Sequence, residues 1–135
     1  MMFRSLSIAL AVASTAALAA GARPRVELQC ESFGDGPQLD CTVRLRAADG
    51  APLKDAKVTL GASMPSMPMA HSVRPVAAAA TAKPGEYRGV LELQMTGVWA
   101  VQIDIAGAAR ERVVLRLRID ECPDDKRCPA PPARQ

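Results

Sequence analysis

The chain has 135 residues, of which 17 are lysine or arginine and 14 are aspartate or glutamate, so its net charge at pH 7 is +3. This near balance lacks the excess of basic residues that is typical of nucleic-acid-binding proteins, and we expect no nucleic-acid partner. Aromatic residues make up only 3% of the chain, so its core must be built mainly from aliphatic side chains.

Residues 1–22 have the pattern of a secretory signal peptide. Arg4 supplies a positive charge, residues 6–18 form an apolar run, and Ala20-Gly21-Ala22 is a suitable cleavage site. The run is shorter than the roughly 20 apolar residues that a membrane-spanning helix needs, and no second run follows. We therefore expect an exported, periplasmic protein that is soluble after cleavage and has no membrane span.

The next segments alternate apolar and polar residues, as half-buried strands do. These segments are residues 25–30, 41–46, 57–62, 72–81, 87–95, 99–105 and 113–119, with the weakest alternation in 72–81. Turn sequences such as Asp49-Gly50 and Lys83-Pro84-Gly85 separate them. About seven short strands at this spacing predict an all-β fold, an immunoglobulin-like antiparallel β-sandwich over residues 23–120. Residues 121–135, rich in proline and charge, are expected to form a flexible tail.

All four cysteines, namely Cys30, Cys41, Cys122 and Cys128, lie after the expected signal peptide. In an oxidising compartment an even number favours disulfides, and neither local pair has the Cys-x-x-Cys spacing of a zinc site. Four cysteines allow three pairings. We favour the local one, Cys30–Cys41 and Cys122–Cys128, in which the first pair joins neighbouring strands whose cysteines face the same side.

Residues 64–71 carry three of the six methionines and the only histidine. Thioether sulfur is a soft ligand that suits Cu(I), and imidazole can complete its coordination. The two prolines of this segment predict an edge or a loop in extended form. A fully extended strand would place its last two methionines and the histidine on one side, whereas a polyproline helix would align the first two methionines. We therefore predict a copper site, with Cu(I) as the metal, formed by Met64, Met67, Met69 and His71.

Methionines also fill gaps in cores and line adaptable partner surfaces. The alternative function is thus a structural or protein-interaction module whose methionine-rich edge docks a partner without metal. Met95 alternates with Leu91 and Leu93, which predicts a core position, although its thioether makes it a candidate extra ligand. With His71 as the only histidine and no glycine-rich phosphate loop, we find no catalytic set and expect no enzyme.

Three motifs resemble the YtkA-like domain family, which is related to FixH-type proteins. They are Met-Pro-x-Met-Pro-Met-x-His at 64–71, Pro-Gly-x-Tyr at 84–87 and Leu-x-Met-x-Gly-x-Trp at 93–99. The likeness covers about residues 51–119. It implies an exported, immunoglobulin-like domain without catalysis, of a kind that accompanies copper handling, metal efflux or respiratory oxidase assembly. A protein of one of these systems is therefore the expected partner.

The chain departs from the family pattern in three ways. The family usually has Met-Gly-His where this chain has Met69-Ala70-His71. FixH-type proteins keep a membrane helix, which we do not expect here after signal cleavage. The two cysteine pairs are a further addition to the pattern.

Overall fold

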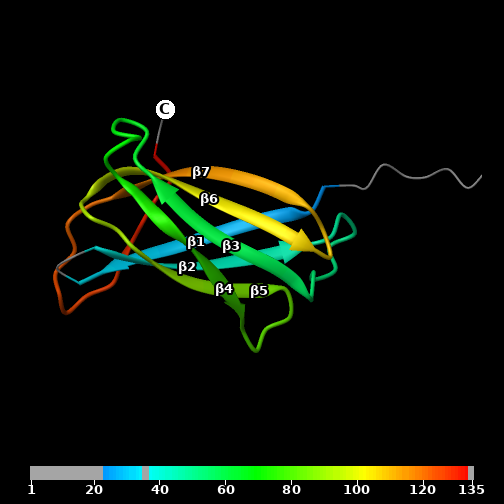
Figure 1. Ribbon diagram of the computed structural model, residues 1–135. Coiled ribbons are helices and arrows are strands. Elements are labelled where there is room, and N and C mark those ends of the chain that lie inside the picture. Colours follow the sequence, from blue (N-terminus) through cyan, green and yellow to red (C-terminus); the bar gives the residue numbers. More distant parts are fainter. Residues whose placement is uncertain (1–22, 35–36, 134–135) are drawn as a thin grey trace, which may run out of the picture.

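The period-two alternation of the sequence produces an all-β structure. The computed structural model describes residues 23–34 and 37–133, so the expected signal peptide at 1–22 lies outside the described residues (Figure 1). The strands are β1 Arg25–Phe33, β2 Gln38–Arg46, β3 Ala56–Ser63, β4 Ser72–Ala80, β5 Glu86–Glu92, β6 Gly97–Gly107, β7 Glu111–Ile119 and β8 Cys128–Pro129. The first seven are the strands predicted from the sequence. Across the described ranges no helix is long and apolar enough to cross a membrane.

All neighbouring strands are antiparallel, and they follow the order β7-β6-β3-β4-β5-β2-β1-β8. The sheet curls into two layers, so that β3, β6 and β7 lie across β1 and β2 (Figure 1). β4 changes layer, because most of it pairs with β3 while only Ala79 and Ala80 pair with β5. The predicted all-β sandwich fold is confirmed, with one short strand more than the seven expected.

The core lies between the inward faces of the two layers. Every second residue of β2 from Leu39 to Leu45 is buried, and so is every second residue of β6 from Trp99 to Ile105. Each such aliphatic side chain stabilises the fold by roughly 1.5–3 kcal/mol. Trp99 is completely buried, and its indole nitrogen donates to the carbonyl of Met95 at 3.0 Å. The turn before β6 is therefore fixed directly to the core.

Both predicted disulfides are present. Cys30 lies directly opposite Cys41 in the β1–β2 ladder, with their Cα atoms 4.1 Å apart. Cys122 is bonded to Cys128 and closes the loop before β8. The inward parity of the first pair was readable from the sequence, and it is what allows the two sulfur atoms to meet between adjacent strands.

The C-terminal segment lies against both outer strands of the curled sheet. We expected residues 121–135 to be a flexible tail, whereas β8 pairs with β1 and Pro132 then forms a bridge with Leu117 of β7. The amide of Ala130 donates to a carbonyl of β1 at 2.9 Å. Prolines are compatible with this position because an outer edge does not require every residue to donate a hydrogen bond. The segment covers the edges of β1 and β7 and joins the two layers.

One end of the sandwich gathers the loops that matter for function. The β3–β4 loop, the β5–β6 turn and the segment after β7 all lie at the end where the C-terminus is marked (Figure 1). The methionine- and histidine-bearing segment 64–71 is the β3–β4 loop.

Candidate metal site

The β3–β4 loop folds into two successive turns. The amide of Met67 donates to the carbonyl of Met64 at 3.0 Å, and the amide of His71 donates to the carbonyl of Met67 at 3.2 Å. The extended and polyproline geometries considered from the sequence are therefore wrong. Pro65 and Pro68 each occupy the second position of a turn, where the fixed φ of proline favours the bend.

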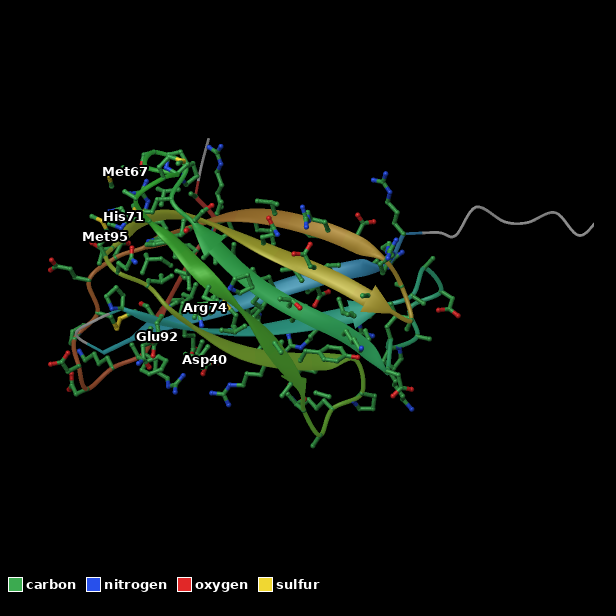
Figure 2. All side chains as sticks on the ribbon, in the orientation of Figure 1. Asp40, Met67, His71, Arg74, Glu92 and Met95 are labelled. Carbon is green, nitrogen blue, oxygen red and sulfur yellow. A yellow bond between two sulfur atoms is a disulfide. The ribbon has the colours of Figure 1, made fainter. Side chains whose placement is uncertain are left out.

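This loop brings Met67 and His71 together. The hydrogen bond between their backbone groups joins residues four positions apart, as in a single turn of helix, and such residues lie on the same side of the chain. Figure 2 shows both residues at the loop end of the sandwich. The Met67 side chain is 38% exposed and His71 is half-buried. A thioether and an imidazole thus belong to the same accessible turn of the loop.

The other two predicted ligands lie elsewhere in the loop. Met64 is only 4% exposed, and its terminal methyl group packs against Gly97 at the start of β6. Met69, in contrast, is 97% exposed. The structure therefore does not bring the four predicted residues into one cluster: it pairs Met67 with His71, buries Met64 and leaves Met69 in solvent.

The imidazole of His71 is held by a residue from another part of the chain. Its Nδ1 atom lies 2.5 Å from Oε1 of Gln94, which belongs to the β5–β6 turn. An amide oxygen only accepts hydrogen bonds, so Nδ1 carries the proton and donates, and the lone pair is on Nε2. Histidines that bind metals are commonly oriented in this way, through a hydrogen bond from the other ring nitrogen. Sequence patterns gave no signal for Gln94, because the contact spans 23 positions.

The predicted core position of Met95 is wrong. Leu91 and Leu93 are buried as the alternation required, but Met95 is 39% exposed. β5 ends at Glu92, and the chain then turns, so the period-two pattern stops before Met95. Figure 2 shows Met95 at the same end of the sandwich as Met67 and His71.

The donors gathered at this end are soft and neutral. Thioether sulfur together with one imidazole nitrogen is a set that suits Cu(I). In the part of the chain that the structure describes, no three His, Cys, Asp or Glu side chains form a metal-binding group. A shallow depression of about 430 Å³ opens beside the turn, and Met95, Asp120 and Glu121 are among the residues that line it. The two carboxylates give the surface next to the turn a negative charge.

A second polar cluster lies well away from Met67, around Asp40 of β2 (Figure 2). Asp40 is 7% exposed; its carboxylate accepts hydrogen bonds from Arg88 on β5, one of them at 2.8 Å, and from Arg127 of the disulfide loop at 2.9 Å. The hydrogen bonds from Arg88, and then the one from Arg127, hold the pKa of Asp40 below its usual value, although burial opposes them. This cluster ties the C-terminal loop to the sheet.

The fold and the loop define a small antiparallel β-sandwich domain with a methionine–histidine pair at one end. The family model described as YtkA-like matches residues 23–104, more than half of the chain, and this protein therefore belongs to the YtkA-like family. The matched region ends within β6, so β7, β8 and the second disulfide lie beyond it. Comparisons with the curated proteins and with the solved structures gave no match.

Proposed function

We propose that this protein is an exported, non-enzymatic copper-binding domain that holds Cu(I) through its β3–β4 loop and delivers it to a partner. The single observation that carries the proposal is the pairing of Met67 with His71, whose Nε2 lone pair is not used by the hydrogen bond to Gln94. A thioether and a neutral imidazole that are accessible on the same side of a short loop provide the soft donors that Cu(I) prefers.

Export is supported by two independent features. Residues 1–22 have the pattern of a signal peptide, and the family match begins at residue 23, directly after them. Both cysteine pairs are disulfides, which form and persist in oxidising compartments such as the periplasm. Methionine suits a copper site in that compartment, because thiols there are consumed by disulfide formation.

The proposed site suits a carrier. Met67 and Met69 are both accessible, so a partner protein can approach a bound ion directly. Met64 is a ligand only if its buried side chain leaves the core, which makes it the weakest of the four predicted ligands. The partner we propose is a protein of copper handling, metal efflux or oxidase assembly, since a carrier needs an acceptor with soft ligands of its own.

The test is an anaerobic Cu(I) titration against a chromogenic competitor, with the mature native protein beside a Met67→Leu/His71→Ala double variant. We expect one tight equivalent in the native protein and its loss in the double variant, with the fold retained and only a small loss of thermal stability, because Met67 is exposed and His71 is half-buried. Arg74→Ala, at an exposed position three residues after His71, is the control and should bind like the native protein. Equal competition by native protein and double variant, or none by either, would overturn the proposal.

One observation favours the alternative function, a docking module without metal. Met69 projects almost fully into solvent at the loop, as a methionine that inserts into a partner would. In that case Met69→Ala should abolish binding to the partner, copper should have no effect on binding, and the titration above should show no tight equivalent.

A further inference from the structure

The β5–β6 turn faces the loop that carries the methionine–histidine pair. We propose that this turn supplies the second half of the metal site, with Gln94 as the residue that positions His71 and Met95 as the third donor. The inference rests on the proposed function, since it concerns the same ion. It replaces a site drawn from one continuous segment with a site shared by the β3–β4 loop and the β5–β6 turn, which connects two strands that do not pair with each other.

Gln94 acts through the imidazole. Nδ1 of His71 lies 2.5 Å from Oε1 of Gln94, and a hydrogen bond donated by Nδ1 to this oxygen orients the ring and favours the tautomer that is protonated on Nδ1. The nitrogen that remains for a metal is Nε2, and the ring does not have to be reoriented when the ion arrives. Gln94 is neutral, so it sets the direction of the ring without adding charge to the site.

The position of Gln94 is itself fixed by the core. It directly precedes Met95, whose carbonyl accepts the indole hydrogen bond of the buried Trp99. On the other side, the amide of Leu93 donates to the carbonyl of Pro37 at 2.9 Å. The turn is thus held at both ends. Because the turn is fixed, the hydrogen bond between Gln94 and His71 locates the β3–β4 loop relative to the sandwich.

Met95 is better placed than Met69 to complete the coordination. It is exposed to the same extent as Met67, 39% against 38%, whereas Met69 is exposed at 97%. It belongs to the turn that already contacts His71 through Gln94, and Figure 2 shows Met95 and His71 at the same end of the sandwich. The methionine side chain has three rotatable bonds, so its sulfur can swing towards a shared ion.

The resulting donor set consists of two thioethers, from Met67 and Met95, and the Nε2 atom of His71. All three donors are neutral, so the single charge of Cu(I) stays uncompensated in the site. The set also lacks the anionic ligands that stabilise divalent ions. We therefore expect the site to bind Cu(I) in preference to Zn²⁺. Binding also joins the β3–β4 loop to the β5–β6 turn, because ligands from both must approach the same ion.

The role of Gln94 is tested without metal, by two-bond ¹H–¹⁵N correlation spectra of the His71 ring in the native protein, Gln94→Ala and Gln94→Glu. We expect a proton on Nδ1 in the native protein, a mixture of tautomers in Gln94→Ala, and recovery in Gln94→Glu, whose carboxylate also accepts. Cu(I) affinity should fall by about 10–100-fold in Gln94→Ala. A native ring protonated on Nε2, or a ring state unaffected by Gln94→Ala, would overturn this role.

The role of Met95 is tested by comparing Met95→Leu with the matched variant Met69→Leu. Loss of a residue that only supports a ligand already weakens metal binding by about tenfold or more, so we expect Met95→Leu to weaken Cu(I) binding by at least that factor. The variant should also lose one sulfur neighbour in the copper X-ray absorption spectrum. Met69→Leu should leave both readouts unchanged. If only Met69→Leu weakens binding, or if neither does, the site shared by the β3–β4 loop and the β5–β6 turn is overturned while the proposed function stands. If the Met67→Leu/His71→Ala variant binds as tightly as the native protein, the proposed function itself is overturned.

Discussion

The terminal methyl group of Met64 packs so closely against Gly97 that a Cβ atom built on the glycine would lie 2.9 Å from it. Gly97 also has a φ of 132°, a conformation that favours glycine. One methionine of the segment 64–71 is thus part of the core at the start of β6, and it anchors the loop that presents the others.

Met64 and Met69 should differ sharply in their contributions to stability. Met64→Ala removes a buried side chain and leaves a cavity, so we expect a loss of about 2–4 kcal/mol in the free energy of unfolding. Met69→Ala removes an exposed side chain and should change that free energy by less than about 0.5 kcal/mol. Urea denaturation of both variants measures the difference. Equal effects would show that the loop packs differently from this structure.

Asp40 should make the stability of the protein sensitive to acid. Its pKa is lowered in the folded state, chiefly by hydrogen bonds from Arg88, so the stabilisation is present above the ordinary value of 3.8 and is lost as the pH falls through the lower folded-state pKa. Asp40→Asn should lower the free energy of unfolding by about 1–2 kcal/mol at pH 7. The variant should also lose less stability than the native protein between pH 5 and pH 2. Parallel stability curves over that range would contradict this account.

The two disulfides should contribute unequally. A crosslink restricts the unfolded chain more when it closes a longer loop, and the separations are 11 residues for Cys30–Cys41 and 6 for Cys122–Cys128. Loop closure gives each about 2–3 kcal/mol, and the buried first pair also packs in the core. Cys30→Ala/Cys41→Ala should therefore destabilise the protein more than Cys122→Ala/Cys128→Ala. The Cys122→Ala/Cys128→Ala variant should mainly speed amide exchange over residues 128–133. Faster exchange throughout the sandwich in that variant would contradict this local effect.

Tyr87 should stabilise the crossing between the two layers. Its hydroxyl donates to the carbonyl of Leu53 at 2.9 Å and accepts from the amide of Ala56 at 3.1 Å, and these residues lie where the chain passes from β2 to β3. Tyr87→Phe keeps the ring but leaves both backbone groups without this partner. We expect a loss of about 1–3 kcal/mol in thermal or urea denaturation. An unchanged stability would mean that water replaces the hydroxyl there.

The strands and the first disulfide could be predicted because both depend on local alternation. The parity of Cys30 with Val26 and Leu28, and of Cys41 with Val43, determines which side each cysteine faces. That parity needs no knowledge of distant contacts, and the observed register places the two cysteines opposite each other.

The candidate site was only partly predictable. Composition pointed to Met67 and His71 as candidate ligands. The prolines were interpreted as extended structure where they start turns, so the expected grouping of the four candidate residues was wrong. Gln94 was missed because nothing in its own neighbourhood marks a contact 23 positions away. β8 was missed for the same reason: a two-residue strand in a proline-rich segment exists only through its pairing with β1.

The covering of β1 and β7 by the C-terminal segment has a consequence for folding kinetics. The hydroxyl of Ser32 in β1 donates to the carbonyl of Cys128, 96 positions further along the chain. Contacts between such distant residues require the chain to close a very long loop before they stabilise anything, and β-sandwiches with this property fold in roughly milliseconds to seconds. We expect the refolding time of the disulfide-intact domain, measured by stopped flow, to fall in that range. The contacts that the C-terminal segment makes with β1 and β7 should be among the last to form.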